Sequence, residues 1–137
     1  MSKMHRLVAV VAAGMIVAPA CGGTSTTVTG RVRDFAIELD ASTIAGGDVT
    51  FEMTNEGPST HELVVQRSTL DPAMLPTLPD VLVDAAGACL EEVGEIAEFA
   101  AGTTASETFA LESGTYVYYC NVAGHYAAGM HGSFTVE

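Results

Sequence analysis

Basic residues are scarce in this sequence. It has 5 lysines and arginines against 17 aspartates and glutamates among 137 residues, which gives a formal net charge of −12. Nucleic-acid binding depends on a basic surface that neutralises phosphates, so this balance argues against a nucleic-acid partner. An acidic surface instead keeps a protein soluble and steers it toward basic partners.

Several sequence signatures of enzymes and of zinc sites are also missing. The chain has no phosphate-binding loop, no Cys-x₂-Cys pair and no convincing order of Ser, His and Asp for a catalytic triad. It shows no internal repeat either. A length of 137 residues and a hydrophobic content of 48% predict one folded domain with a substantial core, besides any targeting segment.

The N-terminal apolar run is too short to span a membrane comfortably. Basic residues Lys3 and Arg6 precede twelve mostly apolar residues, Leu7 to Ala18, whereas a spanning helix needs roughly 20. A basic start followed by a short apolar run is typical of a secretory signal. We therefore interpret residues 1–20 as a signal peptide, which places the domain outside the cytoplasm, in the periplasm or at the outer face of the cell membrane.

The end of this segment resembles a bacterial lipoprotein cleavage site. Small residues lead into Cys21, and a Gly/Thr/Ser-rich linker covers residues 21–27. We expect Cys21 to be the first mature residue and to carry a lipid that anchors the protein to the membrane. Ala18 stands where leucine is usual, so ordinary signal-peptidase cleavage and an uncleaved anchor remain alternatives. Cysteines normally pair in an oxidising compartment. If Cys21 carries a lipid and Cys120 serves another role, Cys89 has no cysteine left to pair with and is an odd thiol.

Residues 28–137 show the patterning of an all-β domain. The clearest alternation lies in residues 48–55, where Val49, Phe51 and Met53 are expected to face the core. Seven or eight short strands with Gly-rich turns predict a β-sandwich. Three prolines interrupt residues 67–92. We interpret that segment as a short helical or irregular excursion, with helical turns around residues 72–75 and 85–92.

One loop near the C-terminus concentrates metal-binding side chains. Cys120 ends a predicted strand, His125 follows five residues later, and Met130 follows five residues after that. A thiolate, an imidazole and a thioether suit a soft, redox-active metal such as copper, and a blue-copper site needs a second histidine. His61, which begins a predicted strand after the turn-rich residues 55–59, is the candidate for that ligand.

Ordinary structural roles are the alternatives for each of these residues. Cys120 could be a buried structural thiol, His61 a turn histidine, and Met130 a flexible side chain that fills a gap in the core. The coincidence of all four in this order favours the metal site. His131 is adjacent to Met130 but points the other way on an extended chain, so we expect it at the surface or in a supporting role.

Residues 55–61 and 119–130 resemble the ligand segments of the cupredoxin family, the blue-copper proteins that include plastocyanin and azurin. The Cys-x₄-His-x₄-Met spacing is most similar to that of rusticyanin and sulfocyanin-like members. The resemblance covers roughly residues 28–137 and implies a single-domain Greek-key β-sandwich. It also implies a type 1 copper site with His61, Cys120 and His125 in one plane and Met130 as the axial ligand. Glu62 departs from the small or amide residue often found after the first histidine.

The resemblance further implies a one-electron carrier, and we expect it to be a monomer. Its partners would be redox proteins, such as a cytochrome, an oxidase or a reductase, which exchange electrons through the edge of His125. That edge would lie in an apolar patch built from residues 122, 123, 127 and 128. A coordinatively closed site argues against an enzyme. The rival function is copper delivery or storage, but delivery sites are often rich in methionine, and Met1, Met4 and Met15 of the six methionines lie in the signal segment.

Overall fold

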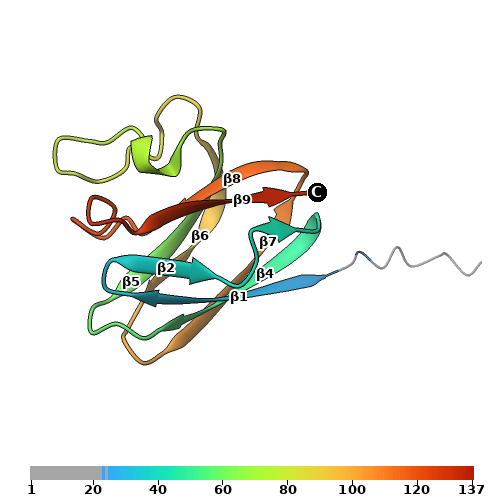
Figure 1. Ribbon diagram of the computed structural model, residues 1–137, viewed down its shortest axis with the longest axis horizontal. Coiled ribbons are helices and arrows are strands. Elements are labelled where there is room, and N and C mark those ends of the chain that lie inside the picture. The colour runs from blue at the N-terminus through green and yellow to red at the C-terminus, as the bar shows by residue number, and fades with distance from the viewer. Residues whose placement is uncertain (1–22, 24) are drawn as a thin grey trace, which may run out of the picture.

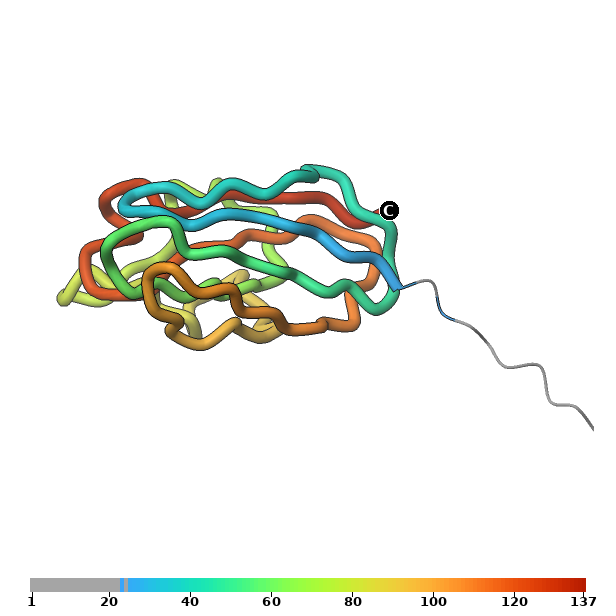
Figure 2. The backbone as a smooth tube through the Cα atoms, turned by 90° about the horizontal axis from the view of Figure 1, so that it is seen from below, coloured from blue at the N-terminus to red at the C-terminus, as the bar shows by residue number. Residues whose placement is uncertain are grey.

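Two β-sheets pack face to face in the computed structural model, which describes residue 23 and residues 25–137 (Figure 1). The predicted signal peptide, the predicted lipid attachment at Cys21 and part of the linker lie outside these described residues. Seen from a second direction, the strands run lengthwise in two layers (Figure 2). Among the described residues, no helix has the length and apolar character needed to cross a membrane.

The two sheets contain nine strands between them. These are β1 (Thr26–Arg33), β2 (Ala36–Leu39), β3 (Thr43–Ile44), β4 (Gly47–Asn55), β5 (His61–Arg67), β6 (Glu91–Phe99), β7 (Thr104–Leu111), β8 (Gly114–Tyr119) and β9 (His131–Val136). The four-stranded sheet has the order β2-β1-β4-β7, and the five-stranded sheet has the order β3-β9-β8-β5-β6. Strands β1 and β4 pair in parallel, as do β3 and β9, so both sheets are mixed. The predicted all-β sandwich is confirmed.

Strand β4 shows how the sequence pattern builds the core. Val49, Phe51 and Met53 are completely buried, while the residues between them face solvent or are only half-buried. Phe51 packs against Phe109 of β7 and Phe134 of β9, with ring centroids 5.9 and 5.5 Å apart. Because each buried aromatic or aliphatic side chain stabilises the fold by about 1.5–3 kcal/mol, this alternation fixes which face of β4 points inward.

The segment between β5 and β6 covers the outer face of the five-stranded sheet, near β8 and β9 (Figure 1). It contains one short 3₁₀ turn, Pro72–Met74, where the Asp71 side chain accepts a hydrogen bond of 2.9 Å from the Ala73 amide. This turn confirms the expected helical turn around residues 72–75. The second expected turn, over residues 85–92, is wrong. Cys89 adopts a left-handed φ of 67°, and β6 is already extended from Glu91 because it pairs with β5.

A second apolar cluster lies beneath this segment. Its buried members are Leu75, Val83, Val117, Tyr119 and Tyr126. Val117 and Tyr119 alternate along β8 with residues that face the core between the sheets. The Tyr126 hydroxyl accepts a hydrogen bond from the Leu75 amide and donates one to the Pro72 carbonyl, each 2.9 Å long. The segment between β5 and β6 is thereby fastened to the loop that carries His125.

Candidate metal centre

Strand register brings His61 and Cys120 to the same end of the sandwich. His61 is the first residue of β5, and Cys120 directly follows the last residue of β8. These strands are antiparallel neighbours in which Val64 pairs with Tyr119. The start of β5 therefore lies beside the end of β8, although the two residues are distant in sequence.

The loop after β8 folds back on itself. The Cys120 amide donates a hydrogen bond of 3.0 Å to the Met130 carbonyl, and the Met130 amide donates one of 3.1 Å to the His125 carbonyl. Gly124 and Gly129 have φ values of 83° and 109°, which only glycine adopts without strain. Two glycines thus allow the tight turns that return Met130 to the side of Cys120.

Three donor atoms converge at this place. The Nδ1 atoms of His61 and His125 lie 3.1 Å apart, and the Cys120 Sγ lies 3.9 Å from the first and 3.4 Å from the second. A metal bound to two imidazole nitrogens at about 2.0 Å each keeps them roughly 3 to 3.5 Å apart. The observed triangle therefore fits one ion with two nitrogen donors and one sulfur donor.

Burial shifts the pKa values of two of these donors, His61 and Cys120. His61 and Cys120 are completely buried, and His125 is half-buried. Desolvation, followed by the proximity of His125, lowers the pKa of His61, which favours the neutral imidazole that binds metals. Desolvation also raises the pKa of the Cys120 thiol, against the opposing effect of the backbone amides of Glu62 and Val122.

A backbone hydrogen bond to Cys120 places Met130 beside this group of donors. Its side chain is fully buried in the core between the sheets. The hydrogen bond from the Cys120 amide to the Met130 carbonyl keeps the two residues adjacent. The axial thioether that the family resemblance implies for Met130 stays a prediction.

The sequence analysis missed one contact of His61, which is with the Asp34 carboxylate. It lies in the turn between β1 and β2, and its Oδ1 is 3.2 Å from the Nε2 of His61. The same carboxylate accepts hydrogen bonds from the amide and the hydroxyl of Ser59. No local sequence pattern indicates this contact, because it depends on the β1–β2 turn packing against the loop before β5.

Apolar side chains surround the exposed side of His125. Phe35, at the tip of the β1–β2 turn, is 57% exposed and meets the His125 ring edge-on at a centroid distance of 6.3 Å. Residues 123, 127 and 128, three of the four in the predicted patch, are exposed alanines, and Val122 is half-buried. Phe35 is an addition that the sequence analysis did not include.

The remaining candidate residues lie outside the converging group. His131 is half-buried in β9 and packs against Tyr126, with ring centroids 5.1 Å apart. Cys89 is an exposed free thiol in the segment between β5 and β6. In the described part of the chain, His61, Cys120 and His125 form the one group of at least three His, Cys, Asp or Glu residues whose donor atoms all lie within 4.8 Å of one another.

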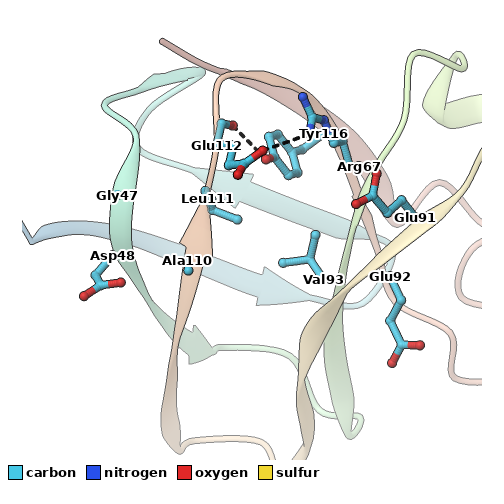
Figure 3. Close-up of a pocket in the computed structure, with 10 residues that line it drawn as sticks. All are labelled: Gly47, Asp48, Arg67, Glu91, Glu92, Val93, Ala110, Leu111, Glu112 and Tyr116. Atoms are coloured by element: carbon cyan, nitrogen blue, oxygen red, sulfur yellow. Dashed lines mark hydrogen bonds and ion pairs between the residues drawn. The ribbon is translucent and has the colours of Figure 1, made fainter.

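A hollow of about 590 Å³ lies at the other end of the sandwich, between the edges of β6 and β7 (Figure 3). Arg67 and Tyr116 line it, from the end of β5 and the start of β8. Arg67 forms an ion pair of 3.5 Å with Glu112, whose carbonyl accepts a hydrogen bond from the Tyr116 hydroxyl. Because β5 spans about 20 Å from His61 to Arg67, this hollow is separate from the donor group.

A family of known proteins and several solved structures resemble this chain. The family model for copper-binding proteins of the plastocyanin/azurin family matches residues 24–137. A dithionite-reduced auracyanin from the photosynthetic bacterium Roseiflexus castenholzii is 26% identical, with a TM-score of 0.59 over 84% of this chain and 99% of that one. No curated protein matches the chain significantly.

Two further solved structures share the fold at lower identity. Auracyanin A, a "blue" copper protein from Chloroflexus aurantiacus, is 22% identical over 83% of this chain and all of that one (100%), with a TM-score of 0.58. Reduced rusticyanin is 18% identical over 82% of this chain and 79% of that one, also with a TM-score of 0.58. The family match spans nearly all described residues, including the converging donors. The chain therefore belongs to the plastocyanin/azurin family of copper-binding proteins.

Proposed function

We propose that this protein is an exported one-electron carrier with a type 1 copper site. The residues that would hold the copper ion are His61, Cys120, His125 and Met130. The observation that carries this proposal is the 3.1 to 3.9 Å triangle of two imidazole nitrogens and one cysteine sulfur. Bound copper supplies a couple between Cu(II) and Cu(I), and a His₂Cys plane with weak axial methionine is typical of electron-transfer sites.

The framework around these donors supports electron transfer because it resists rearrangement. His61 begins a strand that is paired on both sides, with Phe99 opposite it in β6. Cys120 and His125 belong to a loop closed by its own backbone hydrogen bonds. A site that relaxes little between the two oxidation states loses little energy to reorganisation.

His125 is the proposed point of electron entry and exit. It is half-buried, whereas the other three proposed ligands are buried, and exposed apolar side chains surround it. A small apolar contact of this kind suits brief docking with a redox partner such as a cytochrome, an oxidase or a reductase. We propose that the protein works as a monomer, held at the outer face of the membrane or in the periplasm by a lipid on Cys21.

The proposed site has a binding role and no catalytic one. Four protein ligands leave no open position for a substrate, so we propose that the protein is not an enzyme. Copper delivery or storage would require an exchangeable site, and the complete burial of three proposed ligands argues against rapid exchange. Rapid copper loss to a chelator, together with slow reduction, would support delivery instead.

The decisive test is the visible spectrum of the domain loaded with Cu(II). We expect an intense thiolate-to-copper band that is absent in Cys120→Ser and unchanged in Cys89→Ser, since Cys89 lies in the segment between β5 and β6 and Cys120 in the donor group. A colourless copper-loaded protein contradicts the proposal.

A further inference from the structure

We propose that Asp34 is a positioning residue of the copper site, which orients the His61 ring and lowers the reduction potential. This inference rests on the proposed function, because it requires His61 to be a copper ligand. The residue acts through His61 and is not itself a ligand: its Oδ1 approaches Nε2, on the side of the ring away from the donor triangle.

The first step is the choice of tautomer. A neutral imidazole carries one N–H, and its other nitrogen offers a lone pair. His61 places Nε2 at 3.2 Å from the Asp34 carboxylate and Nδ1 at 3.1 Å from the Nδ1 of His125. Donation from Nε2 to Asp34 leaves the lone pair on Nδ1, where the donors converge. Metal-binding histidines commonly use such a carboxylate to fix the ring and strengthen its basicity.

The carboxylate is itself held in place. The Ser59 hydroxyl donates to Oδ2 at 3.0 Å and the Ser59 amide donates to Oδ1 at 3.3 Å. Gly57 packs so closely that a β-carbon there would lie 2.7 Å from the Asp34 backbone nitrogen and 3.0 Å from its Oδ1. The loop before β5 therefore packs tightly around Asp34, so ring orientation is coupled to the β1–β2 turn.

In the contacts described, no lysine or arginine pairs with Asp34, so no basic side chain offsets its negative charge near the site. The neighbouring Arg33 pairs with Glu38 and Glu56 instead. The Asp34 side chain is 29% exposed, and the His61 side chain beside it is fully buried, which weakens solvent screening between them. A fixed negative charge favours the more highly charged Cu(II) over Cu(I). The expected consequence is a lower reduction potential.

The test compares copper-loaded wild type, Asp34→Asn and Asp40→Asn by voltammetry and visible spectroscopy. Asn removes the charge and keeps one acceptor oxygen at the same reach for His61 Nε2. Its amide nitrogen replaces the second oxygen, which faces the Ser59 hydroxyl, a group that can accept as well as donate. Loss of a supporting carboxylate typically changes metal affinity by 10–100-fold. We expect Cu(II) affinity to fall about tenfold relative to Cu(I) affinity, which raises the potential by about 59 mV for one electron. The blue band should persist.

Asp40→Asn is the matched control. Asp40 lies just beyond the same hairpin and bonds to Thr29, far along β1 from the turn, so its loss removes equal charge without contact to His61. We expect no shift in its potential. A blue Asp34→Asn protein with the wild-type potential overturns the inference. A colourless wild type contradicts the proposed copper site itself, so the two failures are distinguishable.

A second measurement covers the case in which Asp34→Asn does not fold or bind copper. ¹⁵N NMR of the wild-type protein loaded with Cu(I) reports which His61 nitrogen carries the proton. We expect a protonated Nε2, and Asp34→Glu, which keeps the charge, should preserve both this signal and the blue band. A proton on Nδ1 in the wild type overturns the inference.

Discussion

The Nδ1 atoms of His61 and His125 lie 3.1 Å apart, although the two residues are 64 positions apart in the sequence. Their rings are tilted by 54° with centroids 4.9 Å apart, so the two nitrogens approach each other without stacking. Two nitrogen lone pairs held this close repel unless a proton or a metal ion lies between them. The folded scaffold therefore prepares a position that a cation stabilises.

Met130→Leu should retain the blue colour and raise the reduction potential. Leucine has a similar volume, so the cost in stability should stay below about 1.5 kcal/mol. If Met130 supplies the proposed weak thioether ligand, this ligand stabilises Cu(II), and its loss favours Cu(I). Visible spectroscopy and voltammetry measure both effects. The control is Met53→Leu, which changes an equally buried methionine of β4 and should leave the potential unchanged. Complete loss of copper from Met130→Leu would show that the axial role is misjudged.

Copper binding should release a proton and strengthen as the pH rises. Burial raises the pKa of the Cys120 thiol above its ordinary value, so the metal-free protein holds this thiol protonated at neutral pH. The bound form is the thiolate, so raising the pH removes a competing proton. We expect the apparent affinity to rise about tenfold per pH unit between about pH 7.5 and 8.5.

Calorimetry in buffers of different ionisation enthalpy measures this proton release. The Cys120→Ser variant is the control, because it lacks the titrating thiol and should lose most of the pH dependence. An affinity that is flat with pH in the wild type contradicts a protonated Cys120 in the metal-free protein.

Acid should destabilise the metal-free protein through His61. Burial lowers the pKa of His61 below its usual value of 6.5, so the unfolded chain binds this proton more readily than the folded chain. The free energy of unfolding therefore decreases as the pH falls from about 6.5 through the lowered pKa. Urea unfolding of wild type and His61→Gln checks the sign: the variant should lose stability less steeply over this range. Equal slopes in the two proteins contradict it.

Asn55→Ala should destabilise the fold by about 2 to 4 kcal/mol. The fully buried Asn55 amide donates to the carbonyls of Ser59 and Phe99, and its side-chain oxygen accepts from the Gly57 amide. Alanine leaves the Gly57 and Ser59 groups in the loop before His61, and the Phe99 carbonyl at the end of β6, without this partner. Urea unfolding measures the loss. The exposed Thr104→Ala change is the control, expected within about 0.5 kcal/mol of wild type, and equal stability of the two variants would sink the claim.

The rate of electron exchange should fall with added salt for a cationic reagent and rise with added salt for an anionic one. The formal net charge is −12, and four of the glutamates that contribute to it lie exposed along one sheet edge, in β6: Glu91, Glu92, Glu95 and Glu98. Stopped-flow reduction by a cationic metal complex should slow as ionic strength rises from about 10 to about 200 mM, because screening weakens the attraction. An anionic complex should react faster with added salt. The same trend for both reagents excludes electrostatic steering.

In the segment between β5 and β6, the sequence predicts one helical turn correctly and a second one wrongly. Pro72 at the start of a turn, after a capping Asp71, gives a short helical piece that the sequence predicts. The residues around Cys89 suggest another turn of helix, yet the chain there enters β6. Pairing of Glu91–Phe99 with β5 outweighs a weak local preference for helix, since tertiary contacts routinely override propensity.

The sequence by itself determined the features that depend on spacing along the chain. Alternation in β4 indicates its buried face, and the Cys120-x₄-His125-x₄-Met130 spacing with its glycines indicates one compact metal-binding loop. Only the tertiary structure decided what reaches that loop from elsewhere. Asp34 meets His61, and Phe35 meets His125, because a turn between β1 and β2 packs against the start of β5 and the loop after β8. Such contacts follow from strand register and sheet packing, which no short window of sequence encodes.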